Sequence, residues 1–159
     1  MTKAAQRRLD EGQVEIIGRH WLIRELLRAG LEAATPERDR GVDLIVYADH
    51  DGSGKFVARP IQLKSASDSS FAVDRKYERI PELLLAYVWH VADTSKTCCY
   101  CLTYPEAEKV ARRMRWTRTK SWTDKEIYTV TSPGQKLVAL LEPFKIKSSG
   151  WPQRIGIPP

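Results

Sequence analysis

Residues 40–47 (RGVDLIVY) and residues 59–65 (RPIQLKS) are the two stretches of this chain that decide its fold. The first is rich in the β-branched and apolar residues that favour β-strands, and the second alternates apolar Ile61 and Leu63 with polar residues. The segment between them contains DHDGSG at residues 49–54, which is typical of a turn. Two strands joined by such a turn most simply pair as an antiparallel hairpin. We therefore expect the start of the first strand to lie beside the end of the second.

Polar residues occupy the points where those strand ends would meet. Asp43 opens the first strand, and Gln62 and Lys64 lie near the end of the second. Because side chains alternate between the faces of a strand, Gln62 and Lys64 share one face while Ile61 and Leu63 point into a core. The pattern predicts that a carboxylate, an amide oxygen and an ammonium group converge. Such a set suits the metal-assisted cleavage of a phosphodiester bond.

The pattern Gly41-x-Asp43 followed by Gln62-x-Lys64-Ser65 resembles the PD-(D/E)XK nuclease superfamily. It is most similar to the Holliday-junction-resolvase-like and Mrr-like branches, in which Gln replaces the second acidic ligand. The resemblance implies that Asp43 binds a divalent metal, that Gln62 is a weaker ligand, and that Lys64 is the catalytic cation that orients the attacking water. Mg²⁺ or Mn²⁺ is the implied cofactor. Because Gln62 stands where most members of the family have a second carboxylate, we expect the site to need a substrate phosphate to complete metal binding.

The family also has a Glu on its first helix, about three turns before the glycine that ends this helix. Counting back from Gly30 reaches Arg19 or His20 instead, so the chain departs from the pattern here. Glu15 lies one turn earlier and on a similar face, which makes it the best candidate for the third acidic group, with Glu25 a poorer one. The predicted metal ligands are therefore Glu15, Asp43 and Gln62.

The same residues have a plainer interpretation. An Asp before a strand is a common turn residue, and Gln-x-Lys on a sheet face is often only a solvated surface. The hairpin alone favours this interpretation, and Glu15 can equally be a helix-surface carboxylate. The order of helix, glycine, Asp-led strand and Gln-x-Lys strand, which matches the family across residues 11–66, favours the functional one.

The remaining pattern indicates an α/β fold with a mixed central sheet flanked by helices, an αβββαβ restriction-endonuclease-like core. We expect a nuclease-like domain over residues 1–147 and an irregular, Gly- and Pro-rich tail over residues 148–159. Helices are predicted over residues 2–29, from Pro105 onward, and over 135–141. Strands are predicted over residues 43–48, 56–65, 83–91, 98–104 and 127–130.

Positive charge is concentrated in the second half of the chain. The formal net charge is +6, and residues 81–159 carry 12 basic and 7 acidic side chains. A stretch with six cations and no acid could neutralise nucleic-acid phosphates, with Trp116 or Trp122 stacking on a base. A solvated helix end that complements the helix dipole is the alternative. The predicted DNA-binding residues are Lys109, Arg112, Arg113, Arg115, Trp116, Arg118 and Lys120.

Composition sets further expectations. The chain has 159 residues, of which 42% are hydrophobic, enough for one buried core, and no apolar run approaches the length of a membrane span. Its N-terminus lacks the apolar segment of a signal peptide, so we expect a cytoplasmic protein. Cys98, Cys99 and Cys101 form one cluster, which favours reduced, buried thiols over a disulfide framework or a zinc site built from two separated pairs.

These observations lead to a metal-dependent DNA endonuclease as the first hypothesis. The alternative is a catalytically weak or inactive nuclease-fold protein with a DNA-binding or regulatory role. Gln62 and the displaced Glu motivate this alternative. A protein-interaction component of a mobile-element or defence system is a third hypothesis. A homodimer would allow both strands of a duplex to be cut, although no sequence feature requires one, and DNA is not distinguished from RNA.

Overall fold

A six-stranded mixed sheet lies at the centre of the computed structural model, which describes residues 8–49 and 55–158. The sheet has the order β1-β2-β3-β5-β6-β8, and β4 and β7 form a separate antiparallel pair. Within the larger sheet β3 and β5 are parallel, and the other neighbours are antiparallel. The strands are β1 (Glu32–Ala34), β2 (Leu44–Asp49), β3 (Phe56–Ser65), β4 (Phe71–Asp74), β5 (Leu84–Trp89), β6 (Cys98–Thr103), β7 (Ile127–Val130) and β8 (Lys145–Ile146).

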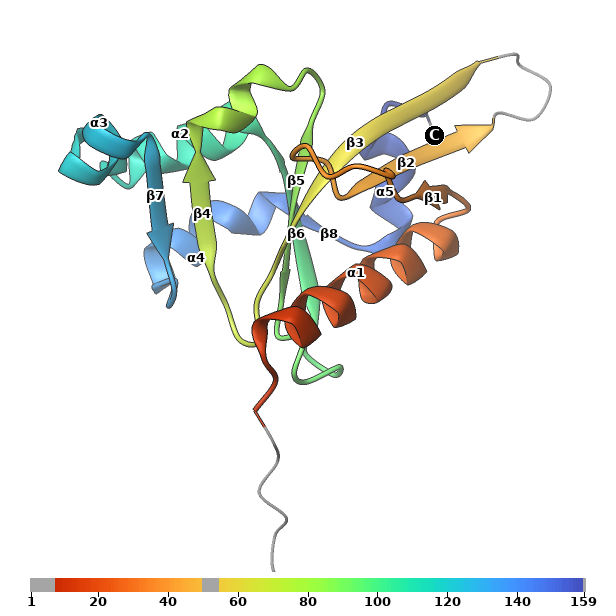
Figure 1. Cartoon of the computed structure of the whole chain (residues 1–159), viewed down its shortest axis with the longest axis horizontal. Helices are drawn as coiled ribbons and strands as arrows, with labels where there is room; N and C mark the ends of the chain where they lie inside the picture. The colour runs from red at the N-terminus through yellow and green to blue at the C-terminus, as the bar shows by residue number, and fades with distance from the viewer. Residues whose placement is uncertain (1–7, 50–54, 159) are drawn as a thin grey trace, which may run out of the picture.

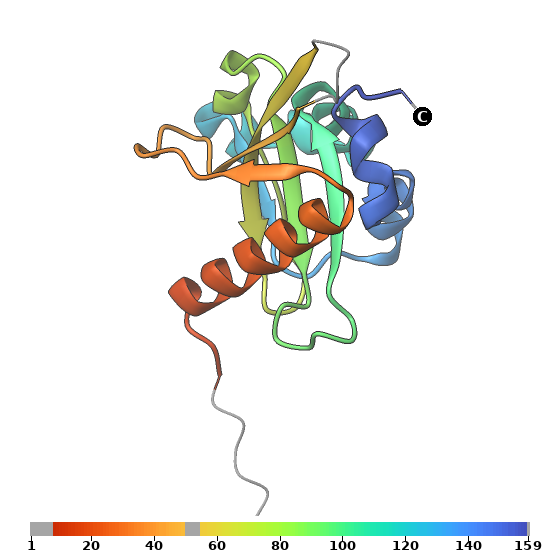
Figure 2. The same cartoon turned by 90° about the vertical axis from the view of Figure 1, so that its right-hand side faces the viewer.

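Helices cover both faces of this sheet (Figure 1, Figure 2). One core lies between the sheet and α1 with α5, and the other between the sheet and α2, α3, α4 and the β4–β7 pair. The α-helices are α1 (Glu11–Arg28), α2 (Tyr104–Arg113), α3 (Lys120–Lys125), α4 (Gln135–Leu141) and α5 (Trp151–Arg154). Short 3₁₀ helices are η1 (Arg75–Arg79), η2 (Trp116–Arg118), η3 (Glu142–Phe144) and η4 (Ser148–Gly150). The predicted class, a mixed sheet flanked by helices, is confirmed.

Strand β5 shows why a sheet covered on both faces forms. All six of its residues are buried. Its side chains alternate between the two cores, as expected for a strand with helices on both sides. Leu84, Ala86 and Val88 pack on the α1 side, whereas Leu85, Tyr87 and Trp89 pack on the α2 side.

Helix α1 begins later than predicted. Its N-cap Asp10 accepts a hydrogen bond from the Gln13 backbone, and the Gln13 side chain accepts one from the Asp10 backbone, so this capping box fixes the helix start at Glu11. Residues 8–10 are not helical, and residues 1–7 of the predicted helix lie outside the described residues. The helix ends before Gly30, whose φ of +76° suits glycine. The buried face has a four-residue spacing and consists of Val14, Gly18, Leu22 and Leu26.

The predicted hairpin is confirmed. Strands β2 and β3 are antiparallel, and Leu44 faces Ile61 in their register. Of the turn predicted over residues 49–54, Asp49 is the last residue of β2, and residues 50–54 lie outside the described residues. Beyond β3 the chain forms β4 and η1 before it returns to the sheet as β5, parallel to β3. This crossover was not predicted, because neither β4 nor η1 is long enough to show a clear periodicity.

The predicted irregular tail is wrong for the part of it that the structure describes. Residues 148–158 contain η4 and α5, and Trp151 and Ile155 are only 1% and 0% exposed. Both side chains pack in the core beside α1, with Ile157. Burial of large apolar side chains therefore outweighs the turn-forming tendency of the neighbouring glycines and prolines.

The three cysteines are free thiols, as predicted, with Cys99 and Cys101 buried and Cys98 half-buried in β6. Across residues 8–49 and 55–158, none of the helices has both the length and the apolarity needed to cross a membrane.

Candidate functional site

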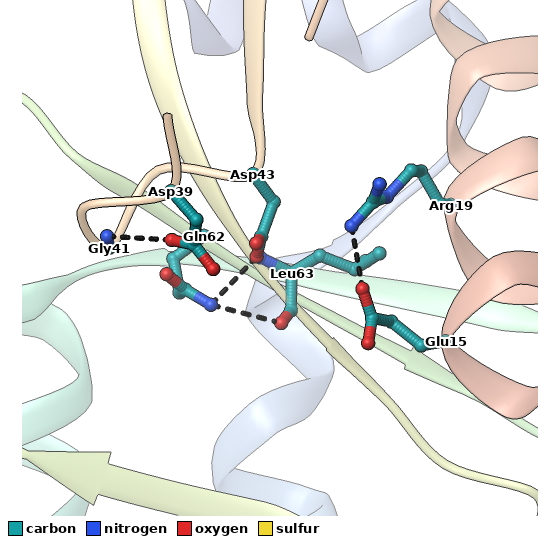
Figure 3. A network of polar contacts seen from close by, with 7 residues as sticks. All are labelled: Glu15, Arg19, Asp39, Gly41, Asp43, Gln62 and Leu63. Carbon is teal, nitrogen blue, oxygen red and sulfur yellow. Dashed lines mark hydrogen bonds and ion pairs between the residues drawn. The ribbon is translucent and has the colours of Figure 1, made fainter. Parts of the chain in front are cut away.

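Asp43 and Gln62 meet at the end of the hairpin, as the sequence predicted (Figure 3). Asp43 immediately precedes β2, and its backbone N–H donates to the Ile61 carbonyl at 2.8 Å, which extends the ladder by one residue. Its carboxylate Oδ2 accepts two hydrogen bonds of 2.7 Å, one from Gln62 Nε2 and one from the Leu63 backbone N–H. The carboxylate is therefore held by β3 at a fixed place beside Gln62.

The Asp43 carboxyl lies in an unfavourable electrostatic environment for a negative charge. Burial is the largest influence and raises its pKa above the ordinary value of 3.8. The Leu63 N–H lowers this pKa, the charge of Asp39 raises it, Arg19 lowers it, and Glu15 raises it. None of the ion pairs among the described residues includes Asp43. A cation bound here would offset the cost of ionising this half-buried carboxyl.

Asp43 Oδ2 and the Leu63 carbonyl oxygen both face the terminal amide of Gln62. Gln62 Nε2 donates both to Asp43 Oδ2 at 2.7 Å and to the Leu63 carbonyl at 3.3 Å, so these acceptors converge on the amide. Half a turn of the terminal amide would present Gln62 Oε1 in place of Nε2. A carboxylate, a backbone carbonyl and an amide oxygen are the hard donors that Mg²⁺ prefers. The donor set therefore fits a hard divalent cation that keeps several water ligands.

Carboxylates are scarce at this position. Within the described residues, no group of three or more His, Cys, Asp and Glu side chains lies close enough to hold a metal. The predicted third ligand, Glu15, is exposed and forms an ion pair of 2.6 Å with Arg19 one turn along α1. Figure 3 shows both side chains projecting from α1 on the Asp43 side of the helix. The structure thus brings Asp43 and Gln62 together but leaves Glu15 neutralised by Arg19.

The poorer candidate, Glu25, belongs to a different part of the molecule. It accepts a hydrogen bond from Ser148 and lies within ion-pair distance of Arg24 and Arg28. These contacts connect the C-terminal half of α1 to η4. Glu25 therefore contributes to the attachment of the C-terminal segment.

Lys64 projects from the same face of β3 as Gln62. The register places Gln62 beside Leu85 and Lys64 beside Tyr87, two residues of the α2-side core. Lys64 Nζ donates to the Tyr77 hydroxyl at 2.9 Å and lies 5.1 Å from the centre of the Tyr77 ring. The ammonium group is therefore ordered by a residue of η1.

A cavity of about 600 Å³ lies between the N-terminal half of α1 and the β4–β7 pair. Lys64 and Ser65 of β3 line it, with Glu11 and Glu15 of α1 on one side and Ala72 of β4 on the other. Its size is within the range usual for ligand sites. Glu15 and Lys64 therefore line a common cavity, although they belong to different elements.

The basic stretch does not form one surface. All six cations are exposed. Arg112 and Arg118 line a cavity of about 490 Å³ together with Arg75 of η1. Lys109 and Arg113 line a different cavity, of about 240 Å³, beside α4. Four of the six predicted cations are therefore divided between two cavities on different sides of α2, and Arg115 and Lys120 line neither of them.

Trp116 is not available to stack on a base, which corrects that part of the predicted DNA-binding set. Its side chain is 5% exposed and stacks on Tyr128 with 4.6 Å between ring centres. Trp122 is also buried. Both indoles belong to the α2-side core, because apolar burial is worth more to the fold than an exposed ring.

Tyr77 and Arg19 contact predicted site residues but were not recognised from the sequence. Tyr77 reaches Lys64 only because the chain passes through β4 and η1 after β3, a path that no periodic pattern in residues 66–82 indicates. Arg19 does have a local signal, since Glu15 and Arg19 have the i, i+4 spacing of a helical ion pair.

Comparison of the chain with protein-family models, with curated proteins and with solved structures finds no significant match.

Proposed function

We propose that this protein is a divalent-metal-dependent DNA endonuclease that hydrolyses phosphodiester bonds at the Asp43–Gln62–Lys64 site. One observation carries the proposal: Asp43 is a half-buried carboxylate that has hydrogen-bond donors but no ion-pair partner among the described residues, and a backbone carbonyl and an amide lie beside it. The resemblance to PD-(D/E)XK nucleases supports the same assignment.

Each residue has a role that its position suggests. Asp43, the Leu63 carbonyl and, after rotation of its amide, Gln62 would hold Mg²⁺ or Mn²⁺. The bound metal would supply water activation and stabilise charge on the phosphate. Lys64 lines the cavity that Leu63 also lines, and its positive charge would stabilise the negative charge that develops on the scissile phosphate. Glu15 lines the same cavity and would join the site after it leaves Arg19.

The exposed cations supply a surface for the DNA backbone. Arg112 and Arg118 share a cavity with Arg75, which begins the same 3₁₀ helix that carries Tyr77. We infer that this side of α2 contacts phosphates of DNA bound at Lys64, and that binding weakens as salt concentration rises.

A second candidate function has its own support. The Glu15–Arg19 ion pair and the Gln62 amide nitrogen beside Asp43 describe a site with little negative charge for a metal. A nuclease-fold protein with these features would bind DNA without cutting it, or would cut it slowly.

The test uses supercoiled, linear and branched DNA with Mg²⁺, with Mn²⁺ and with a chelator. Asp43→Asn and Lys64→Met are compared with Asp124→Asn and Lys96→Met, which remove the same charges from exposed positions outside the site. The nuclease proposal predicts metal-dependent cutting that both site variants lose and both control variants keep. DNA binding, measured by fluorescence anisotropy, should persist in all four variants.

Two results would count against the proposal. Metal-dependent cutting that survives Asp43→Asn would place the chemistry elsewhere. An absence of cutting on all three substrates, with binding that weakens as salt rises, would favour the DNA-binding protein instead.

A further inference from the structure

We propose that Tyr77 is the positioning residue for Lys64. It would hold the ammonium group in a fixed position relative to the turn that leads to Asp43. This inference rests on the proposed function, because it assigns a role within the same site. The geometry points to Tyr77 through three features: its contact with Lys64, its own rigidity, and its proximity to Gly41.

The contact fixes the far end of a flexible side chain. Lysine has a four-carbon stem with several rotatable bonds, so an ammonium group without a partner samples many positions. The Tyr77 hydroxyl lies 2.9 Å from Lys64 Nζ and accepts one of its three N–H groups. This contact leaves two N–H groups of Lys64, a residue that also lines the cavity beside α1, for other partners.

Tyr77 itself is firmly held. Its side chain is 4% exposed and belongs to the α2-side core. It lies in η1, which Asp74 caps through a hydrogen bond of 3.0 Å from the Lys76 N–H. The Lys76 ammonium lies 4.9 Å from the centre of the Tyr77 ring and adds a cation–π contact. Because the Tyr77 hydroxyl is held in place, it restricts the positions that the Lys64 ammonium group can take.

The Tyr77 ring also approaches the turn before Asp43. A Cβ atom at Gly41 would lie 3.8 Å from Tyr77 Cε1 and 3.3 Å from Ile80 Cδ1. Gly41 has φ of +86°, and its N–H donates to Asp39 at 3.0 Å. Asp43 follows two residues later. The Tyr77 ring therefore lies against the turn that places the Asp43 carboxylate. The hydroxyl of the same ring binds the Lys64 ammonium group.

Removal of the hydroxyl should slow chemistry more than it weakens substrate binding. In Tyr77→Phe the ring still packs against Gly41, but Lys64 loses its acceptor. A hydrogen bond to a charged group accounts for roughly a ten- to hundredfold effect on a rate when it acts at the transition state. We expect kcat to fall by about that factor while KM changes by less than about threefold.

The matched control is Tyr104→Phe, which deletes another phenol hydroxyl whose oxygen is buried and has no hydrogen-bond partner in the structure. Kinetics are compared with the ¹⁵Nζ–¹H NMR signal of Lys64, assigned by its loss in Lys64→Met. The proposal predicts a sharp signal in the wild type and in Tyr104→Phe, and a broadened or missing signal in Tyr77→Phe. Thermal unfolding checks that all three proteins are folded.

The two readouts separate this inference from the proposed function. If no DNA is cut by any variant, the NMR comparison still tests whether Tyr77 orders Lys64. An unchanged Lys64 signal in Tyr77→Phe would overturn the inference, and so would a kcat equal to that of Tyr104→Phe in an active enzyme. A loss of activity that appears wholly as a raised KM would overturn it too, because it would assign Tyr77 to substrate binding.

Discussion

Asp43 is the residue whose chemistry most constrains the site, because the fold holds it in place at an electrostatic cost. Burial raises its pKa, so the folded state without metal binds a proton at Asp43 more tightly than the unfolded chain does. The stabilising contribution of this proton is therefore complete below the unfolded pKa of 3.8 and is lost as pH rises through the folded pKa.

Replacement of Asp43 by Asn tests this linkage. Asp43→Asn keeps an oxygen that can accept the Leu63 N–H and removes the costly charge. We expect its unfolding temperature to exceed that of the wild type at pH 7 without metal, and the difference to shrink as pH falls toward 3.8. Thermal unfolding across this pH range measures it, with Asp124→Asn, at an exposed position away from Asp43, as the control. A difference that grows as the pH falls would contradict the assigned sign.

Gln62 offers the complementary test, since Gln62→Glu restores the second carboxylate. The change replaces a donor to Asp43 Oδ2 by a like charge. We expect the metal-free protein to lose about 1–3 kcal/mol of unfolding free energy. Mg²⁺ should raise its unfolding temperature by more than it raises that of the wild type, because two carboxylates now face the ion.

The control for Gln62→Glu is Gln135→Glu, which introduces the same charge at an exposed helix position. Differential scanning fluorimetry with and without Mg²⁺ would compare the three proteins. Equal Mg²⁺ shifts in all of them would argue against metal binding at Gln62.

Among the site residues, the sequence predicted those that lie on the hairpin. The two-residue alternation of β3 and the turn predicted between the two strands suffice to bring Asp43 to Gln62 and to place Lys64 on the same face as Gln62. The Lys64–Tyr77 contact and the burial of Trp116 could not be predicted, because both depend on where distant segments pack. The ion pair between Glu15 and Arg19 could have been predicted from their helical spacing alone.

At the scale of elements, the approach of α1 to β3 sets the position of Glu15 and Arg19. The two elements meet at Gly18, where a Cβ atom would lie 2.0 Å from Ser65 Oγ and 2.8 Å from Ser65 Cβ. No side chain larger than hydrogen fits without a shift of the helix. Gly18 is therefore required for close packing of α1 on β3.

Gly18→Ala should force α1 away from β3. We expect it to cost about 1–3 kcal/mol of unfolding free energy, as overpacking of a core does. Gly12→Ala is the matched control, because its nearest neighbour would be Asp10 Oδ1 at 3.4 Å and alanine favours a helix. Urea unfolding should show a loss for Gly18→Ala and no loss for Gly12→Ala. Equal stability of the two variants would show that α1 can move at little cost.

Several elements of four or more residues have the predicted bounds, whereas the two shortest strands were missed. Strand β7 and helix α4 have the predicted bounds, and β3 also does. Strands β1 and β8 contain three and two residues, too few to show alternation, and were missed. Their pairing is determined by the sheet that they join.

At the scale of the whole molecule, the division of the basic stretch leads to a prediction about DNA. Arg118 lies on the side of α2 that also contains η1, whereas Lys109 lies on the α4 side. Arg118→Glu should weaken DNA binding and reduce the slope of log affinity against log salt by about one unit or more. Lys109→Glu, a charge change of the same size, should have a smaller effect.

A salt titration of binding, followed by fluorescence anisotropy, measures both variants. Equal losses for Arg118→Glu and Lys109→Glu would indicate that DNA follows α2 itself and contacts both sides. A loss confined to Lys109→Glu would place the DNA on the α4 side, away from Lys64.

The overall architecture was predicted only in outline. The fold class, a mixed sheet flanked by helices, follows from strands with apolar residues on both faces and from amphipathic helices. The same patterns do not predict that β3 and β5 are parallel neighbours or that the C-terminal segment is ordered. The segment at residues 148–158 is held by Trp151 and Ile155, whose packing against the α1-side core is a property of the complete fold.

A nuclease site at Asp43 is tested by the initial rate at which the protein nicks supercoiled plasmid DNA in Mg²⁺, for the wild type and for Asp43→Asn. We expect nicking by the wild type that a chelator abolishes, and nicking by the variant that is about a hundredfold slower, because loss of a charged partner at the reacting centre costs about this much. Equal rates for the two proteins, or no nicking by the wild type, would contradict a nuclease site at Asp43.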